Sequence, residues 1–129
     1  METERIRNFR DLDAWKLAME LAVMCYSVAS RLPTEERYGL ASQVRRAAVS
    51  VPSNIAEGHS SGSDGILKRH LQISLGSVGE LRTHLELIQR LGLLQDTERR
   101  PTLDQLARTT QVLHGFLRSV RAKQVKKAG

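Results

Sequence analysis

Apolar residues recur along most of the chain at intervals of three and four positions, which is the spacing of one face of an α-helix. This periodicity predicts four helices, at about residues 12–31, 35–57, 64–91 and 102–125. We expect Asp11 to be the N-cap of the first and Gly58 to end the second, while Thr102 and Gln105 have capping-box spacing at the start of the fourth. Almost no segment alternates with period two. The chain of 129 residues therefore predicts a single all-α domain, an antiparallel up-down four-helix bundle.

The first predicted helix is apolar over an unusually wide arc. A helix that faces a core needs an apolar arc of about 100°, and this one covers roughly twice that. The surplus face predicts contact with another subunit, and hence a homo-oligomer. The residues assigned to that interface are Leu17, Leu21, Met24 and Val28. A locally apolar surface or deep burial is the alternative.

A polar wedge follows one side of the second predicted helix, and two polar residues of the third interrupt an apolar flank. The members of this set are Gln43, Arg46, Ser50, Asn54, Glu57, Ser77 and Glu80. At 1.5 Å per residue the wedge from Arg46 to Glu57 extends about 16 Å, which is too long for one metal ion or one reacting atom. It suits a polar network between helices or subunits, or else a surface that contacts a ligand. We expect Arg46 to pair with Glu80, because an unpaired buried carboxylate is costly.

The net charge of +6 arises from 20 basic and 14 acidic residues, and much of the excess lies in a basic tail at residues 118–129. Such a tail favours polyanions through counterion release, although cations also suit a solvated helix end. The candidate residues for nucleic-acid contact are Arg45, Lys68, Arg69, Arg118, Arg121, Lys123, Lys126 and Lys127. Aromatic residues make up only 4% of the chain, so base stacking would contribute little. Binding should be directed at phosphates, sensitive to salt and weakly specific for sequence.

The sequence offers no recognisable set of catalytic residues. It lacks the residue order and nucleophile context of a Ser-His-Asp catalytic triad, a phosphate-binding loop, and the histidine and cysteine spacing of a metal site. We therefore expect no enzyme activity, metal or cofactor. The single cysteine, Cys25, is predicted to be a core residue. No apolar run is long enough to span a membrane, and the first residues do not resemble a signal peptide, so a cytoplasmic protein is expected.

Three segments resemble a known family: FRDLDAWKLAMEL (9–21), LPTEERYGLASQVRRAAVSVPSNIAEG (32–58) and LQISLGSVGELRTHLELIQRLGLL (71–94). They are similar to the four-helix-bundle proteins encoded in intervening sequences of bacterial 23S rRNA genes. The resemblance implies a bundle that assembles as a ring, with a homopentamer expected. A related branch, the accessory proteins of diversity-generating retroelements, implies nucleic acid and a reverse transcriptase as partners. The resemblance to the family supplies no active site, and the C-terminal third of this chain matches the family poorly.

Two functional hypotheses follow. The first is a non-enzymatic, ring-shaped protein that binds structured RNA or RNA/DNA through basic surfaces. The second is a scaffold for protein–protein interaction with no nucleic-acid ligand, in which the basic residues serve solubility. Whether the basic residues gather on one surface distinguishes the two.

Overall fold

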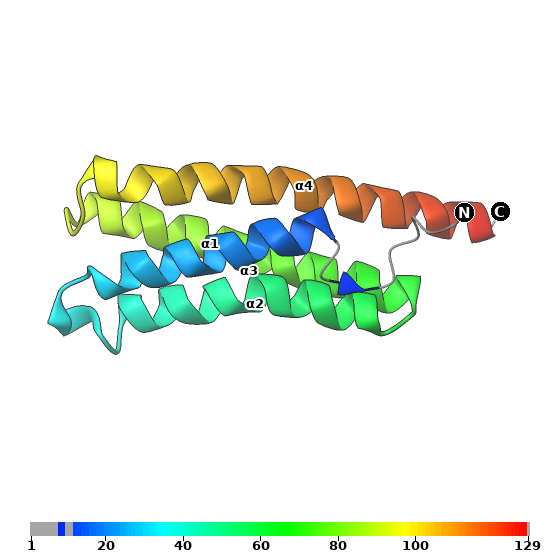
Figure 1. Cartoon of the computed structure of the whole chain (residues 1–129), viewed down its shortest axis with the longest axis horizontal. Helices are drawn as coiled ribbons and strands as arrows, with labels where there is room; N and C mark the ends of the chain where they lie inside the picture. The colour runs from blue at the N-terminus through cyan, green and yellow to red at the C-terminus, as the bar shows by residue number, and fades with distance from the viewer. Residues whose placement is uncertain (1–7, 10–11, 129) are drawn as a thin grey trace.

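The computed structural model describes residues 8–9 and 12–128. It contains α1 (Asp13–Ser30), a short 3-10 helix η3 (Thr34–Glu36), α2 (Leu40–Ser60), α3 (Asp64–Arg90) and α4 (Asp96–Ala128). The four α-helices lie side by side along the long axis of the molecule, and the connections between them lie at its two ends (Figure 1). Within the described residues there are no strands, so the predicted all-α fold of four helices is confirmed.

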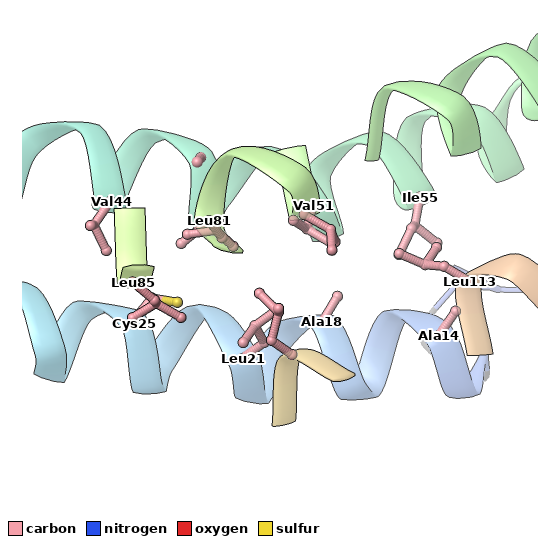
Figure 2. Close-up of a cluster of buried hydrophobic side chains, with 14 of the residues drawn as sticks. Ala14, Ala18, Leu21, Cys25, Val44, Val51, Ile55, Leu81, Leu85 and Leu113 are labelled. Carbon is pink, nitrogen blue, oxygen red and sulfur yellow. The ribbon is translucent and has the colours of Figure 1, made fainter. Parts of the chain in front are cut away.

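Each helix packs against two neighbours. α1 contacts α2 and α4, and α3 contacts α2 and α4, so the four helices occupy the corners of a square in chain order. The core between them consists mainly of aliphatic side chains from all four helices, and Figure 2 shows part of it. The residues labelled there are Ala14, Ala18, Leu21, Cys25, Val44, Val51, Ile55, Leu81, Leu85 and Leu113. The predicted core position of Cys25 is confirmed, because its side chain is fully buried.

The second helix begins later and ends later than predicted. Residues 34–36 form the separate 3-10 turn, and Gly39 adopts φ −108° and ψ −109°, which is not helical. The Glu36 carboxylate then accepts a hydrogen bond from the Leu40 amide at 3.2 Å, so it supplies the helix start with an acceptor. At the other end α2 continues through Gly58 to Ser60, and the reversal is made by Gly62 at φ +72°.

The fourth helix begins at Asp96, six residues before the predicted start, and Pro101 lies inside it. The Glu98 carboxylate accepts from the Gln95 amide at 3.1 Å, which is the backward half of a capping box. The predicted cap at Thr102 is therefore wrong. Gln105 instead donates a side-chain hydrogen bond to the Leu17 carbonyl of α1 at 3.1 Å. The other predicted cap, Asp11, lies outside the described residues.

The predicted oligomer interface on α1 requires correction. Leu21 and Val28 are 0% and 2% exposed within the single chain, so they belong to its core and cannot contact another subunit. Leu17 and Met24 are half-buried on the side that faces α4. The surplus apolar surface lies instead on the side towards α2, and its exposed members are Met19, Val23 and Tyr26. The arc is wide because α1 packs against two helices, α2 and α4, and its apolar positions continue beyond the contact with α2.

Candidate functional site

The seam between α2 and α3 holds a chain of hydrogen bonds. The Ser77 hydroxyl of α3 donates to the Ser50 hydroxyl of α2 at 2.7 Å. The Asn54 amide donates to the Ser50 hydroxyl at 3.0 Å and to the Ser50 carbonyl at 2.8 Å. The Asn54 carbonyl oxygen lies 2.8 Å from Nδ1 of His70. Three residues of the predicted polar set are thus joined across two helices, in an arrangement that fixes the register between them.

His70 is a member of this network that sequence reasoning missed. Its Nε2 lies 3.9 Å from the carboxylate of Glu57, so the network ends at that exposed acid. The sequence spacing indicates that His70 belongs with Ser77, because His70 precedes Ser77 by seven residues and therefore lies on the same helix face. Nearby, the buried Ser74 hydroxyl donates to the Val51 carbonyl at 2.8 Å, which adds a second polar tie between α2 and α3.

The remaining residues of the polar set lie further along the same seam. Gln43, Arg46 and Glu80 line an open pocket of about 360 Å³ together with Ala47 and Ser50. Within the described part of the chain no ion pair joins Arg46 to Glu80, so the expected pairing is not formed in the single protein. Both residues are exposed, and their charges can therefore remain solvated without a partner.

His84 lies one helical turn after Glu80 on α3. Its two ring nitrogens are buried and have no hydrogen-bond partner. Burial holds the pKa of His84 below its ordinary value of 6.5, although the charge of Glu80 acts in the opposite direction. His84 is therefore a neutral packing residue at neutral pH.

The most distinctive surface of the molecule is the exposed side of α4. From residue 100 to residue 127 the sequence contains seven Lys and Arg residues and one Asp. All seven are exposed, and they are Arg100, Arg108, Arg118, Arg121, Lys123, Lys126 and Lys127. We call this set the α4 basic surface. The charges of these seven residues and of Asp104 sum to +6, which equals the net charge of the whole chain.

The C-terminal part of α4 is tied to the start of α3. Lys127 donates to the Asp64 carboxylate at 2.8 Å, and Lys123 lies 3.8 Å from the same carboxylate. The hydrogen bond from Lys127 and the charges of both lysines hold the pKa of Asp64 below its ordinary value. Because Lys68 and Arg69 follow Asp64 by about one turn, they lie at the same end of the bundle as the basic tail.

Arg45 is the nucleic-acid candidate that lies elsewhere. With Tyr26, Ser42, Arg46 and Val49 it lines a pocket of about 450 Å³ between α1 and α2. This side of the bundle lies away from the exposed surface of α4, because α2 and α4 occupy opposite corners. The predicted nucleic-acid candidates therefore divide into a large group at α4 and the start of α3, and Arg45 on α2, where Arg46 of the polar set lies beside it.

The described residues include no group of three or more His, Cys, Asp or Glu side chains that could hold a metal ion. None of the described helices is both long enough and apolar enough to cross a membrane. What the described surface does offer is a polar seam, a basic surface and exposed apolar patches, all of which suit binding.

Comparison with known proteins identifies the family. The model of the 23S rRNA-intervening sequence protein family matches residues 10–115, most of the chain. The chain belongs to this family. No curated protein matches the chain. This family member also shares its fold with a crystal structure from Bacteroides thetaiotaomicron, described as a protein of unknown function from the S23 ribosomal protein family. The TM-score is 0.75 at 20% identity, over 81% of this chain and 95% of that one.

The family match ends before the basic tail. Residues 118–127 of α4 lie beyond the matched range, so the family relationship does not account for the five Lys and Arg residues there. The polar seam and the exposed apolar residues Met19, Val23 and Tyr26 of α1 lie within the matched range. Any role of the tail must therefore be argued from this chain.

Proposed function

We propose that this protein is a non-enzymatic nucleic-acid-binding protein that contacts structured RNA or RNA/DNA through the α4 basic surface. It would act as a ring-like homo-oligomer of antiparallel up-down bundles, with the homopentamer that the family resemblance implies. The observation that supports this proposal is that the Lys and Arg residues of α4 from Arg100 onwards are all exposed and, with Asp104, carry a charge equal to the net charge of the chain. A reverse transcriptase, as in the related branch of the family, is the protein partner to test first.

The extent of the α4 basic surface fits a nucleic-acid backbone. From Arg100 to Lys127 the helix rises about 40 Å at 1.5 Å per residue, slightly more than one turn of a double helix. Lysine and arginine side chains along such a row contact phosphates and release counterions, so affinity should fall steeply with salt. The few aromatic residues provide little stacking, and discrimination between sequences should be weak.

The residues to change are those without an acidic partner. Asp64 already pairs with Lys123 and Lys127, whereas no ion pair joins an acid to Arg118, Arg121 or Lys126 within the described residues. Replacing these three by glutamate should abolish binding of a fluorescently labelled RNA hairpin at physiological salt. At lower salt, the residual binding should depend less steeply on salt concentration, by the contribution of about three phosphate contacts.

A matched control carries the same change of charge on other elements. Glutamate at Lys16, Arg37 and Arg82, which lie on α1, after η3 and on α3, should leave most of the affinity intact. Fluorescence anisotropy between about 50 and 200 mM salt measures both variants. Equal loss in the two variants would mean that total charge, and not the α4 basic surface, causes binding. No binding by the unmodified protein at low salt would favour the interaction scaffold.

A further inference from the structure

Two apolar surfaces of the bundle are left uncovered by the described residues. The first, which we call the α1/α2 face, contains Met19, Val23 and Tyr26 of α1 and Val49 of α2, each at least 40% exposed. A groove of about 340 Å³ lies in this face, with Met19 and Val49 on its two sides and Pro52 beside them. Exposed apolar residues that are contiguous and flank a groove are typical of an interaction surface.

The second surface, which we call the α3 stripe, follows one side of α3. It contains Ile66, Ile73, Leu87 and Leu91, which are 42–59% exposed. Glu80 lies midway in this row, seven residues from both Ile73 and Leu87, and forms no ion pair within the described chain. Because Glu80 shares a pocket with Gln43 and Arg46 of α2, the stripe opens on the α2 side of α3.

The two surfaces carry complementary groups. The α1/α2 face continues past Val49 into the pocket that contains Arg45 and Arg46, and none of the described residues that line this pocket is acidic. The α3 stripe has the converse composition, with a single carboxylate among aliphatic side chains. An arginine pair beside an apolar groove thus matches a glutamate within an apolar row. Among the described residues none of the three forms an ion pair, and Arg45 donates one hydrogen bond, to the Arg37 carbonyl.

The complementary groups also lie at matching levels along the bundle. Glu80 is level with Arg46, because the two line one pocket, and Arg46 is level with Tyr26 of the α1/α2 face. Ile73 is level with the groove, because its neighbour Ser74 bonds to the Val51 carbonyl and Val51 adjoins Pro52. A copy of the chain placed alongside, without sliding along the axis, would therefore bring both pairs of groups together.

We propose that the α1/α2 face of one subunit binds the α3 stripe of the next copy of this chain. In this contact Glu80 faces the Arg45–Arg46 pair, and Ile73 enters the groove beside Val49. The inference rests on the homo-oligomer in the proposed function and adds the surfaces that meet.

The contact is heterologous, and the level match means that repeating it produces no rise along the bundle axis. A heterologous contact of this kind closes a ring when the rotation between neighbouring copies divides a full turn, and both surfaces adjoin α2, so neighbouring copies are rotated and not merely displaced. Both contacting surfaces adjoin α2, so α4, at the opposite corner, stays on the outside of the ring. The α4 basic surface consequently remains accessible to nucleic acid in the assembly.

Blocking each surface separately tests the contact. Val49→Glu places a charge in the α1/α2 face, and Ile73→Glu places one in the α3 stripe. Both positions are more than 40% exposed, so the single chain should remain folded, as circular dichroism would verify. Val125→Glu changes a 73% exposed valine of α4 and serves as the matched control, which should assemble like the unmodified protein.

Size-exclusion chromatography with light scattering should find each blocked variant monomeric. An equal mixture of the two should form a dimer and nothing larger, because only one open copy of each surface remains. A second measurement uses charge: Arg45→Glu and Glu80→Arg should each weaken assembly, and the two substitutions combined in one chain should restore it.

Every other outcome overturns the inference. If either blocked variant still dimerises alone, the surfaces bind their own kind and the contact is not heterologous. If both blocked variants assemble normally, the interface lies elsewhere, although the homo-oligomer itself stands. If the unmodified protein is monomeric, the ring fails as well, and RNA binding by the α4 basic surface is then judged by its own assay.

Discussion

Replacing Gly58 by alanine tests how closely α2 and α3 approach each other at this glycine. The sequence pattern predicts a helix stop, where glycine adopts a positive φ that alanine disfavours. In the structure α2 continues through a buried Gly58 to Ser60. A Cβ at this position would lie 2.8 Å from Cβ of His70, and 3.2 Å from both Cα and Cδ1 of Leu67.

These distances fix the sign of the effect. The Cβ of His70 and the backbone of Leu67 cannot rotate away, so α2 and α3 would have to separate by a few tenths of an ångström. Overpacking of this kind costs about 1–3 kcal/mol. The better helix propensity of alanine offsets up to about 1 kcal/mol of this cost. With the full offset we expect a net loss of up to about 2 kcal/mol, or as much as roughly 8 °C in the melting midpoint for a chain of this size.

Urea and thermal unfolding followed by circular dichroism measure this loss, at one protein concentration because assembly would shift the midpoint. Gly79→Ala is the matched control, since Gly79 lies within α3 and a Cβ there meets nothing within 4 Å. That variant should be more stable by up to about 1 kcal/mol. If Gly58→Ala were stabilised to the same extent as Gly79→Ala, the close approach of α2 and α3 at Gly58 would be refuted.

Two further predictions concern buried titratable groups. The folded-state pKa of His84 is lowered, so the unfolded chain binds the proton more readily, and stability is lost as the pH falls below 6.5. His84→Leu should therefore lessen the fall in the urea midpoint between about pH 7 and 5. An unchanged fall would contradict a role of His84 in the pH dependence. Burial raises the pKa of the Cys25 thiol to about 12, so iodoacetamide should modify it at about pH 8 only after unfolding, and rapid alkylation of the native protein would show that it is accessible.

Helix periodicity predicted the existence of the four helices, but it located their ends less well. The predicted start at Glu35 was wrong because Gly39 is not helical and the Glu36 carboxylate caps the amide of Leu40, where α2 begins. The predicted start at Thr102 failed because Glu98 provides a cap upstream and the helix accommodates Pro101. Both ends depend on single side-chain hydrogen bonds, which periodicity does not contain.

The polar seam was predictable in part. Ser50, Asn54 and Ser77 were identified from their position on helix faces, and the structure joins them. His70 was missed because it resembled an isolated histidine until α2 supplied Asn54 as its partner. Such a network depends on which helices are adjacent, and adjacency is a property of the packed bundle.

The sequence by itself determined the helical class of this protein, its number of helices, its core positions such as Cys25, and the local excess of cations near the C-terminus. These follow from the spacing and charge of residues that are near one another in the chain. Only the tertiary structure decided which apolar stripe of α1 remains exposed, because Leu21 and Val28 are buried by other helices. It likewise placed Asp64 against Lys127, sixty-three positions away, since contacts between distant residues depend on how the helices pack.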